Sequence, residues 1–108
     1  MAYDEGLAER VRDRLTAQAA ITEQKMFGGL AFLEHGHIVV GIMGDDLLVR
    51  VGADGKAEAL TRRGTREFDF TGRPMRGFVV VAGETLDDDA LADWMARGRR
   101  FAATLPPK

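Results

Sequence analysis

The amino-acid sequence predicts a two-layer α+β fold, in which an antiparallel β-sheet of about five strands is flanked by an N-terminal and a C-terminal helix. Apolar residues recur at helical spacing near both ends of the chain, whereas short apolar runs separated by glycine-containing turns fill its middle. A short middle helix interrupts these runs. The length of 108 residues suits one hydrophobic core, so we assign residues 1–108 to a single domain.

The first predicted element is an amphipathic helix over residues 4–19. Leu7, Val11 and Leu15 form its apolar face, and mixed charges occupy the opposite face. Asp4 is the expected N-cap, because its carboxylate can accept hydrogen bonds from the unpaired amides of the first turn. We expect the apolar face to lie across the sheet and the charged face to be solvated.

A meander of short antiparallel strands follows from Gln24 onward. Its apolar runs are residues 25–27, 30–34, 37–43 and 47–51, with turns at 28–29, 35–36 and 44–46. In the last run Leu47, Val49 and Val51 share one face of the strand, whereas Leu48 and Arg50 share the other. Because Leu33, Ile38, Val40 and Ile42 add further apolar surface, we expect helices on one face of the sheet and a second copy of the chain on the other, which makes a homodimer.

The second half of the meander contains a rigid corner. A helix from Lys56 to Arg62, ended by Gly64, is followed by a strand over 67–70 and another over 77–82. Between these strands Gly72 can adopt a positive φ, and Pro74 fixes its own φ and disfavours helical geometry at the preceding residue. We expect this turn to present Arg73 and Arg76 at fixed positions.

The last element is a second amphipathic helix, and Pro106 and Pro107 end it. Its apolar stripe comprises Leu91, Trp94, Gly98, Phe101 and Leu105, and Thr85 or Asp87 can cap its start. A glycine inside a helix costs about 1 kcal/mol relative to alanine. We therefore expect Gly98 to allow a close approach between this helix and the sheet or another helix.

Composition argues against several classes of function. The chain lacks cysteine, which excludes disulfides, thiol catalysis and thiolate metal sites and fits a cytoplasmic location. It lacks serine, and its glycines match neither the Rossmann nor the P-loop pattern. No apolar run approaches the ~20 residues of a membrane span. The net charge of −2 argues against nucleic-acid binding by the domain alone. We expect no catalytic residue, no cofactor and no membrane contact.

The remaining candidates for chemistry are histidines, aspartates and arginines. His35 and His37 fall at a hairpin, where exposed turn residues are a better interpretation than a metal site. Turn and capping roles likewise explain residues 45–46 and 87–89, so no metal is expected.

The arginines leave alternatives open. Arg62, Arg63 and Arg66 can pair with neighbouring acidic residues, or they can contact phosphate or an acidic protein surface. The candidate interaction residues of the chain as a whole are Lys25, Arg50, Arg73 and Arg76, which could also line a pocket for an anion.

Four ordered motifs resemble the TfoX N-terminal domain family, named for the TfoX/Sxy regulators of competence development. They are residues 25–29 (KMFGG), 45–52 (DDLLVRVG), 69–79 (DFTGRPMRGFV) and the closing Trp94 helix with Leu105-Pro106. The resemblance extends over essentially the whole chain. It implies an antiparallel sheet flanked by helices, like the secretion-chaperone-type two-layer folds.

The resemblance also implies a regulatory function without enzymatic activity. The longer competence regulators carry a second, C-terminal domain and act with a cyclic-AMP receptor protein at particular promoters, whereas this chain is similar to short stand-alone members. We expect a non-enzymatic interaction module, a transcription-related regulator or coactivator that contacts a protein partner. The alternatives are a small-molecule or anion-binding domain and a weak direct DNA binder.

Overall fold

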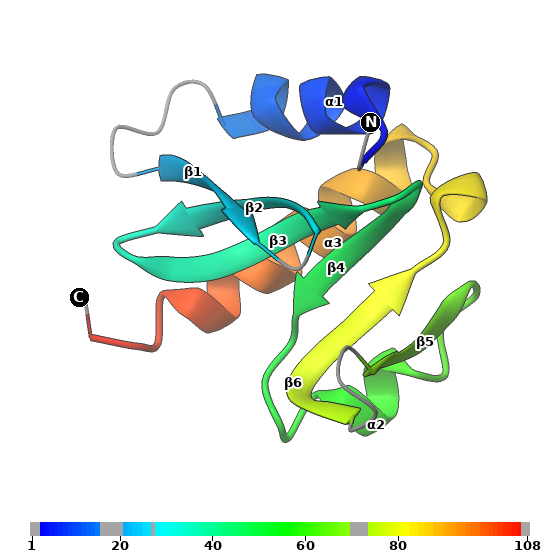
Figure 1. Ribbon diagram of the computed structural model, residues 1–108. Coiled ribbons are helices and arrows are strands. Elements are labelled where there is room, and N and C mark those ends of the chain that lie inside the picture. The colour runs from blue at the N-terminus through cyan, green and yellow to red at the C-terminus, as the bar shows by residue number, and fades with distance from the viewer. Residues whose placement is uncertain (1–2, 16–20, 27, 70–73, 107–108) are drawn as a thin grey trace.

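A six-stranded antiparallel sheet, covered on one face by two long helices, forms the domain (Figure 1). The computed structural model describes residues 3–15, 21–26, 28–69 and 74–106. The elements are α1 (Glu5–Leu15), β1 (Ile21–Met26), β2 (Gly29–Glu34), β3 (His37–Met43), β4 (Asp46–Arg50), α2 (Lys56–Ala59), β5 (Thr65–Asp69), β6 (Pro74–Val81), the 3-10 turn η1 (Gly83–Thr85) and α3 (Asp88–Ala102). The strand order is β1-β2-β3-β4-β6-β5. The predicted fold class is therefore confirmed, with six strands where about five were expected.

Helix α1 follows its sequence pattern closely. Asp4 accepts hydrogen bonds at Oδ1 from the backbone amides of Gly6 (2.8 Å) and Leu7 (3.3 Å), so the predicted N-cap is confirmed. The predicted apolar residues of this helix are buried against the sheet. The described helix ends at Leu15, and the remainder of the expected span, residues 16–19, lies outside the described residues.

Helix α3 packs on the same face of the sheet as α1. Asp87, rather than Thr85, is its N-cap, because the Asp87 carboxylate accepts a hydrogen bond from the Ala90 amide (2.7 Å), whereas the Thr85 hydroxyl donates to the Ala82 carbonyl. The helix ends at Ala102, so Leu105, which was expected on its apolar stripe, lies beyond its last turn. The large cluster of buried residues between the helices and the sheet contains side chains from both helices and from β2, β3, β4 and β6.

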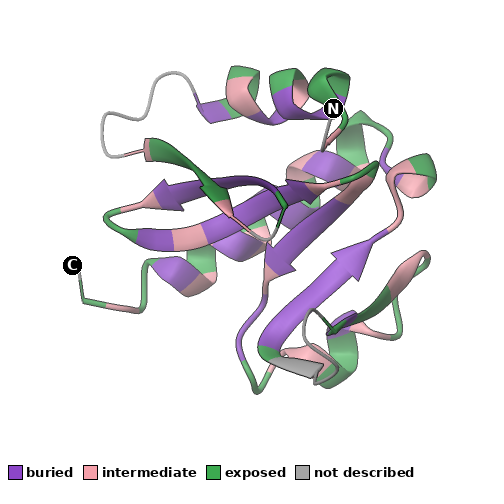
Figure 2. Cartoon of the chain, in the orientation of Figure 1, coloured by how far each residue is buried: buried purple, intermediate pink, exposed green. Residues whose placement is uncertain are grey.

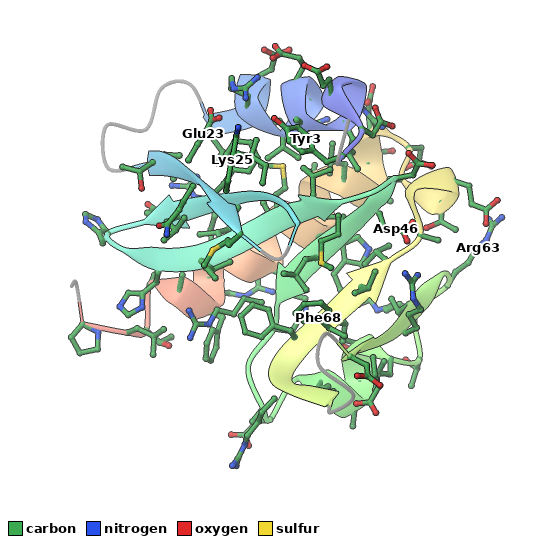
Figure 3. The ribbon with its side chains drawn as sticks, viewed as in Figure 1. Tyr3, Glu23, Lys25, Asp46, Arg63 and Phe68 are labelled. Atoms are coloured by element: carbon green, nitrogen blue, oxygen red, sulfur yellow. The ribbon has the colours of Figure 1, made fainter. Side chains whose placement is uncertain are left out.

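The second face of the sheet has a smaller core of its own. It consists of Leu48, Phe68, Phe78 and Val80, each at most 7% exposed, and the Phe68 and Phe78 rings meet edge to face with centroids 6.4 Å apart. Figure 2 shows the buried colour along most of β4 and β6, which carry Leu48, Phe78 and Val80, and Figure 3 shows Phe68 in front of the sheet. Much of the apolar surface that motivated the homodimer is therefore covered within one chain. The homodimer itself stays a prediction.

Several boundaries differ from the sequence prediction. Helix α2 ends at Ala59, three residues early, and β5 begins at Thr65, two residues before the expected start. Strand β6 begins at Pro74 rather than Gly77. The corner residues 70–73, which include Arg73, lie outside the described residues.

The two histidines have different environments. His35 is an exposed turn residue with φ of 52°, as predicted, but the expectation of an exposed side chain is wrong for His37. His37 is only 8% exposed, and its Nε2 lies 2.6 Å from the carbonyl oxygen of Pro106. The segment that follows α3 therefore reaches the start of β3 and contacts the ring.

The described part of the chain contains no group of three or more acidic or histidine side chains placed to hold a metal ion. None of its helices is long and apolar enough to cross a membrane.

Candidate functional site

The structure separates the residues that the sequence singled out as interaction candidates. Lys25 is exposed on β1, Arg50 is the partly exposed last residue of β4, and Arg76 is exposed on β6. Arg73 lies outside the described residues. Figure 3 shows the Lys25 side chain pointing toward α1.

Lys25 and Arg50 lie on opposite faces of the sheet. The strand register aligns Lys25 with Leu30, Leu30 with Ile42 and Ile42 with Leu47, all three of which belong to the core beneath the helices. Arg50 is three residues beyond Leu47, so strand alternation directs its side chain to the other face. The two cations therefore do not line a common pocket.

Arg50 is held between two aromatic rings. Its guanidinium carbon lies 5.4 Å from the centroid of the Phe78 ring and 5.7 Å from that of the Phe101 ring. Phe78 is the direct partner of Arg50 in the β4–β6 pair, and Phe101 comes from the last turns of α3. Such distances are typical of cation–π contacts, which hold the guanidinium in place.

The backbone beside Arg50 is shaped for this contact. The amides of Val51 and Gly52 both donate to the carbonyl of Gly77, at 2.8 and 3.0 Å, and so join the segment that follows β4 to the middle of β6. Gly52 has φ of 82°, and a Cβ at this position would lie 2.5 Å from the Phe101 ring. Only glycine therefore lets the ring approach β4. The sequence pattern placed Phe101 on the helix stripe and missed this role; the glycine directly after the Val-Arg-Val run was the available signal.

The Arg50 guanidinium has no acidic partner among the residues that the structure describes. Desolvation by the surrounding side chains lowers the pKa of Arg50, but an arginine remains charged at neutral pH. A fixed guanidinium with unused N–H donors is a receptor for a carboxylate or a phosphate group. We define the Arg50 site as Arg50, Phe78 and Phe101 with the exposed Arg76 nearby on β6.

The arginines before the corner are largely paired. Arg62 contacts Glu58 of α2 (3.0 Å), which confirms the interpretation that it pairs with an acidic helix residue. Arg66 contacts Asp46 of β4 (2.8 Å), a partner that is distant in sequence and was not predicted. Arg63 is exposed and has no ion pair within the described part of the chain.

A comparison with known proteins identifies the family of this chain. The model of the TfoX N-terminal domain matches residues 13–102, a range that contains every strand of the sheet and the Arg50 site. Searches of curated proteins and of solved structures returned no match. Since the matched range is well over half of the 108 residues, the chain belongs to the TfoX N-terminal domain family.

Proposed function

We propose that this protein is a non-enzymatic, transcription-related regulator or coactivator that contacts a protein partner through the Arg50 site. Membership of the TfoX N-terminal domain family supports a regulatory or interaction function in general. The observation that carries the proposal is the Arg50 guanidinium, which two aromatic rings hold in place while no described residue neutralises it. The proposal includes a cytoplasmic location, which the absence of cysteine from the chain fits.

The chemistry of the Arg50 site favours an acidic partner. A guanidinium that is already partly desolvated loses little hydration when a carboxylate binds, and its planar fork can form two parallel hydrogen bonds with that carboxylate. Exposed Arg76 on β6 supplies a second positive charge, which would steer an acidic surface toward the site. Arginine and aromatic side chains are also enriched among residues that dominate protein–protein binding.

Site-specific photo-crosslinking tests the location of the contact. Ala53 is exposed, and its amide nitrogen lies next to Gly77 of β6, which directly precedes Phe78, so a crosslinking residue at position 53 would report a partner at the Arg50 site. The control carries the same residue at the exposed Glu84 in η1, which follows the opposite end of β6. We expect capture of an acidic partner from position 53 and not from position 84. Equal capture from both positions would contradict the proposed surface.

The substitution Arg50→Lys tests the role of the guanidinium. It keeps the positive charge but removes the bidentate fork, so partner affinity should fall about tenfold or more. Lys25→Ala, on the opposite face of the sheet, is the control and should bind normally. Cells that express Arg50→Lys at wild-type levels should show the transcript profile of cells without the protein. An unchanged profile, or DNA binding by the domain alone at physiological salt, would argue against a coactivator that acts through protein contact.

A further inference from the structure

A second basic site lies along α3, and it shares no residue with the Arg50 site. A groove of about 520 Å³ runs between α3 and the segment that joins α2 to β5. Its charged lining consists of four arginines and one aspartate: Arg62, Arg63, Arg97, Arg100 and Asp93. Its volume falls in the range of roughly 300–1,000 Å³ typical of small-molecule sites.

Two of the four arginines are fixed by a shared carboxylate. Glu58 lies 3.0 Å from Arg62 and 2.6 Å from Arg97. Arg97 also donates to the carbonyl of Gly55 at 3.2 Å, and its guanidinium carbon lies 5.5 Å from the centroid of the Trp94 ring. These contacts connect the two walls of the groove, and one carboxylate balances only one of the two cations.

The other two arginines are not neutralised. Arg63 on the α2–β5 segment and Arg100 on α3 form no ion pair or hydrogen bond with any residue that the structure describes. Counting Asp93 and Glu58 against the four arginines leaves a surplus of two positive charges. The chain as a whole carries −2, so this surplus is a local concentration of positive charge.

From these observations we infer that the groove binds a small phosphorylated ligand, whose phosphate group lies between Arg63 and Arg100. A phosphate dianion matches the surplus of two charges, and guanidinium groups form bidentate hydrogen bonds with phosphate oxygens. Ala90, Trp94 and Ala96 also line the groove and provide an apolar wall for the rest of the ligand. This site shares no residue with the Arg50 site, so an experiment can refute the proposal for one site and leave the proposal for the other intact.

Calorimetric titration of the full chain with pyrophosphate and with adenosine diphosphate tests the inference. The test variant is Arg63→Ala/Arg100→Ala, which removes two unpaired surface charges and leaves the Glu58 network in place. The matched control is Arg14→Ala/Lys25→Ala. It removes the same number of positive charges as the groove variant, but from α1 and β1, outside the groove. Thermal unfolding of each variant establishes that it is folded.

We expect saturable binding of both phosphate probes to the wild type, weakened about tenfold or more in the groove variant and little changed in the control. Affinity should also fall as salt is raised, since the contact is between charges. Three outcomes would overturn the inference: no saturable binding at millimolar probe and low salt, equal weakening in both double variants, or equally tight binding of succinate. The last outcome would identify a general carboxylate site instead.

Discussion

Gly98 of α3 lies directly against the backbone carbonyl of Val39 in β3. A Cβ at position 98 would stand 2.6 Å from that oxygen and 3.2 Å from Cγ1 of the Val39 side chain. The prediction that this glycine permits close packing is thereby confirmed, and its contact is with the sheet. The same contact sets the spacing of the two layers, so a substitution that disturbs it should change the free energy of unfolding.

The substitution Gly98→Ala should destabilise the protein. Alanine is the better helix former by about 1 kcal/mol, but the new methyl group would push α3 away from the sheet, and such overpacking typically costs 1–3 kcal/mol. Chemical denaturation measures the net change. Gly6→Ala is the matched control, because its Cβ would meet only the Asp4 carboxylate tip at 3.2 Å. If both variants gained stability, the contact with Val39 would not limit packing.

Glu34 of β2 and Arg99 of α3 should make stability depend on pH. Their two parallel contacts of 2.9 and 3.1 Å lower the pKa of Glu34, with the hydrogen bond from Arg99 as the main cause. The unfolded state therefore binds more protons than the folded state below the ordinary carboxyl pKa of about 4.3. The stabilisation is present above that pH and is lost as the pH falls through the lower, folded-state pKa.

The variant Glu34→Gln tests this dependence. Its free energy of unfolding should be about 1 kcal/mol lower than that of the wild type at neutral pH. This difference should shrink in acid, as measured by chemical denaturation at a series of pH values. Glu84→Gln serves as the control, because Glu84 is exposed and forms no ion pair with any described residue. If the difference in unfolding free energy between Glu34→Gln and the wild type stayed constant from neutral pH into acid, the Glu34–Arg99 ion pair would not be its source.

His37 should contribute to stability through its contact with the C-terminal segment. The ring is buried, and its Nε2–H donates to the Pro106 carbonyl at 2.6 Å. His37→Ala would remove the donor and leave a cavity, at an expected cost of about 2 kcal/mol or more. The control is His35→Asn, since His35 is exposed and asparagine tolerates its positive φ. Equal thermal stability of His37→Ala and the control would show that the tail contact is dispensable.

The expected homodimer can be tested by light scattering at micromolar concentration. Because Phe68, Phe78 and their neighbours are buried within one chain, the partly exposed Ile38 and Met43 are the apolar residues beside that cluster that remain for a contact. We expect twice the mass of one chain for the wild type and a monomer for Met43→Lys. Ala57→Lys, on exposed α2, should behave as the wild type. A wild-type mass of one chain would refute the dimer.

Local patterns in the sequence were sufficient for the elements and their orientation. The period of Leu7, Val11 and Leu15 identifies the buried face of α1, and the alternation from Leu47 to Val51 assigns β4 residues to the correct faces. These predictions succeed because helical and strand periodicities depend only on nearby residues. The N-caps at Asp4 and Asp87 could be predicted for the same reason, because each depends on residues within one helical turn. The family motifs are likewise short runs of neighbouring residues.

Tertiary structure alone decided which distant side chains meet. His37 and Pro106 are 69 positions apart, and their contact turned an expected surface histidine into a buried one. Arg50 contacts the Phe101 ring because the last turns of α3 pack beside β4. The basic groove arises because α3 lies next to the α2–β5 segment. Such contacts depend on how the layers pack, and no periodicity within one segment records that arrangement. The sequence therefore determined the elements and the family, whereas the packing of α3 on the sheet determined both candidate sites.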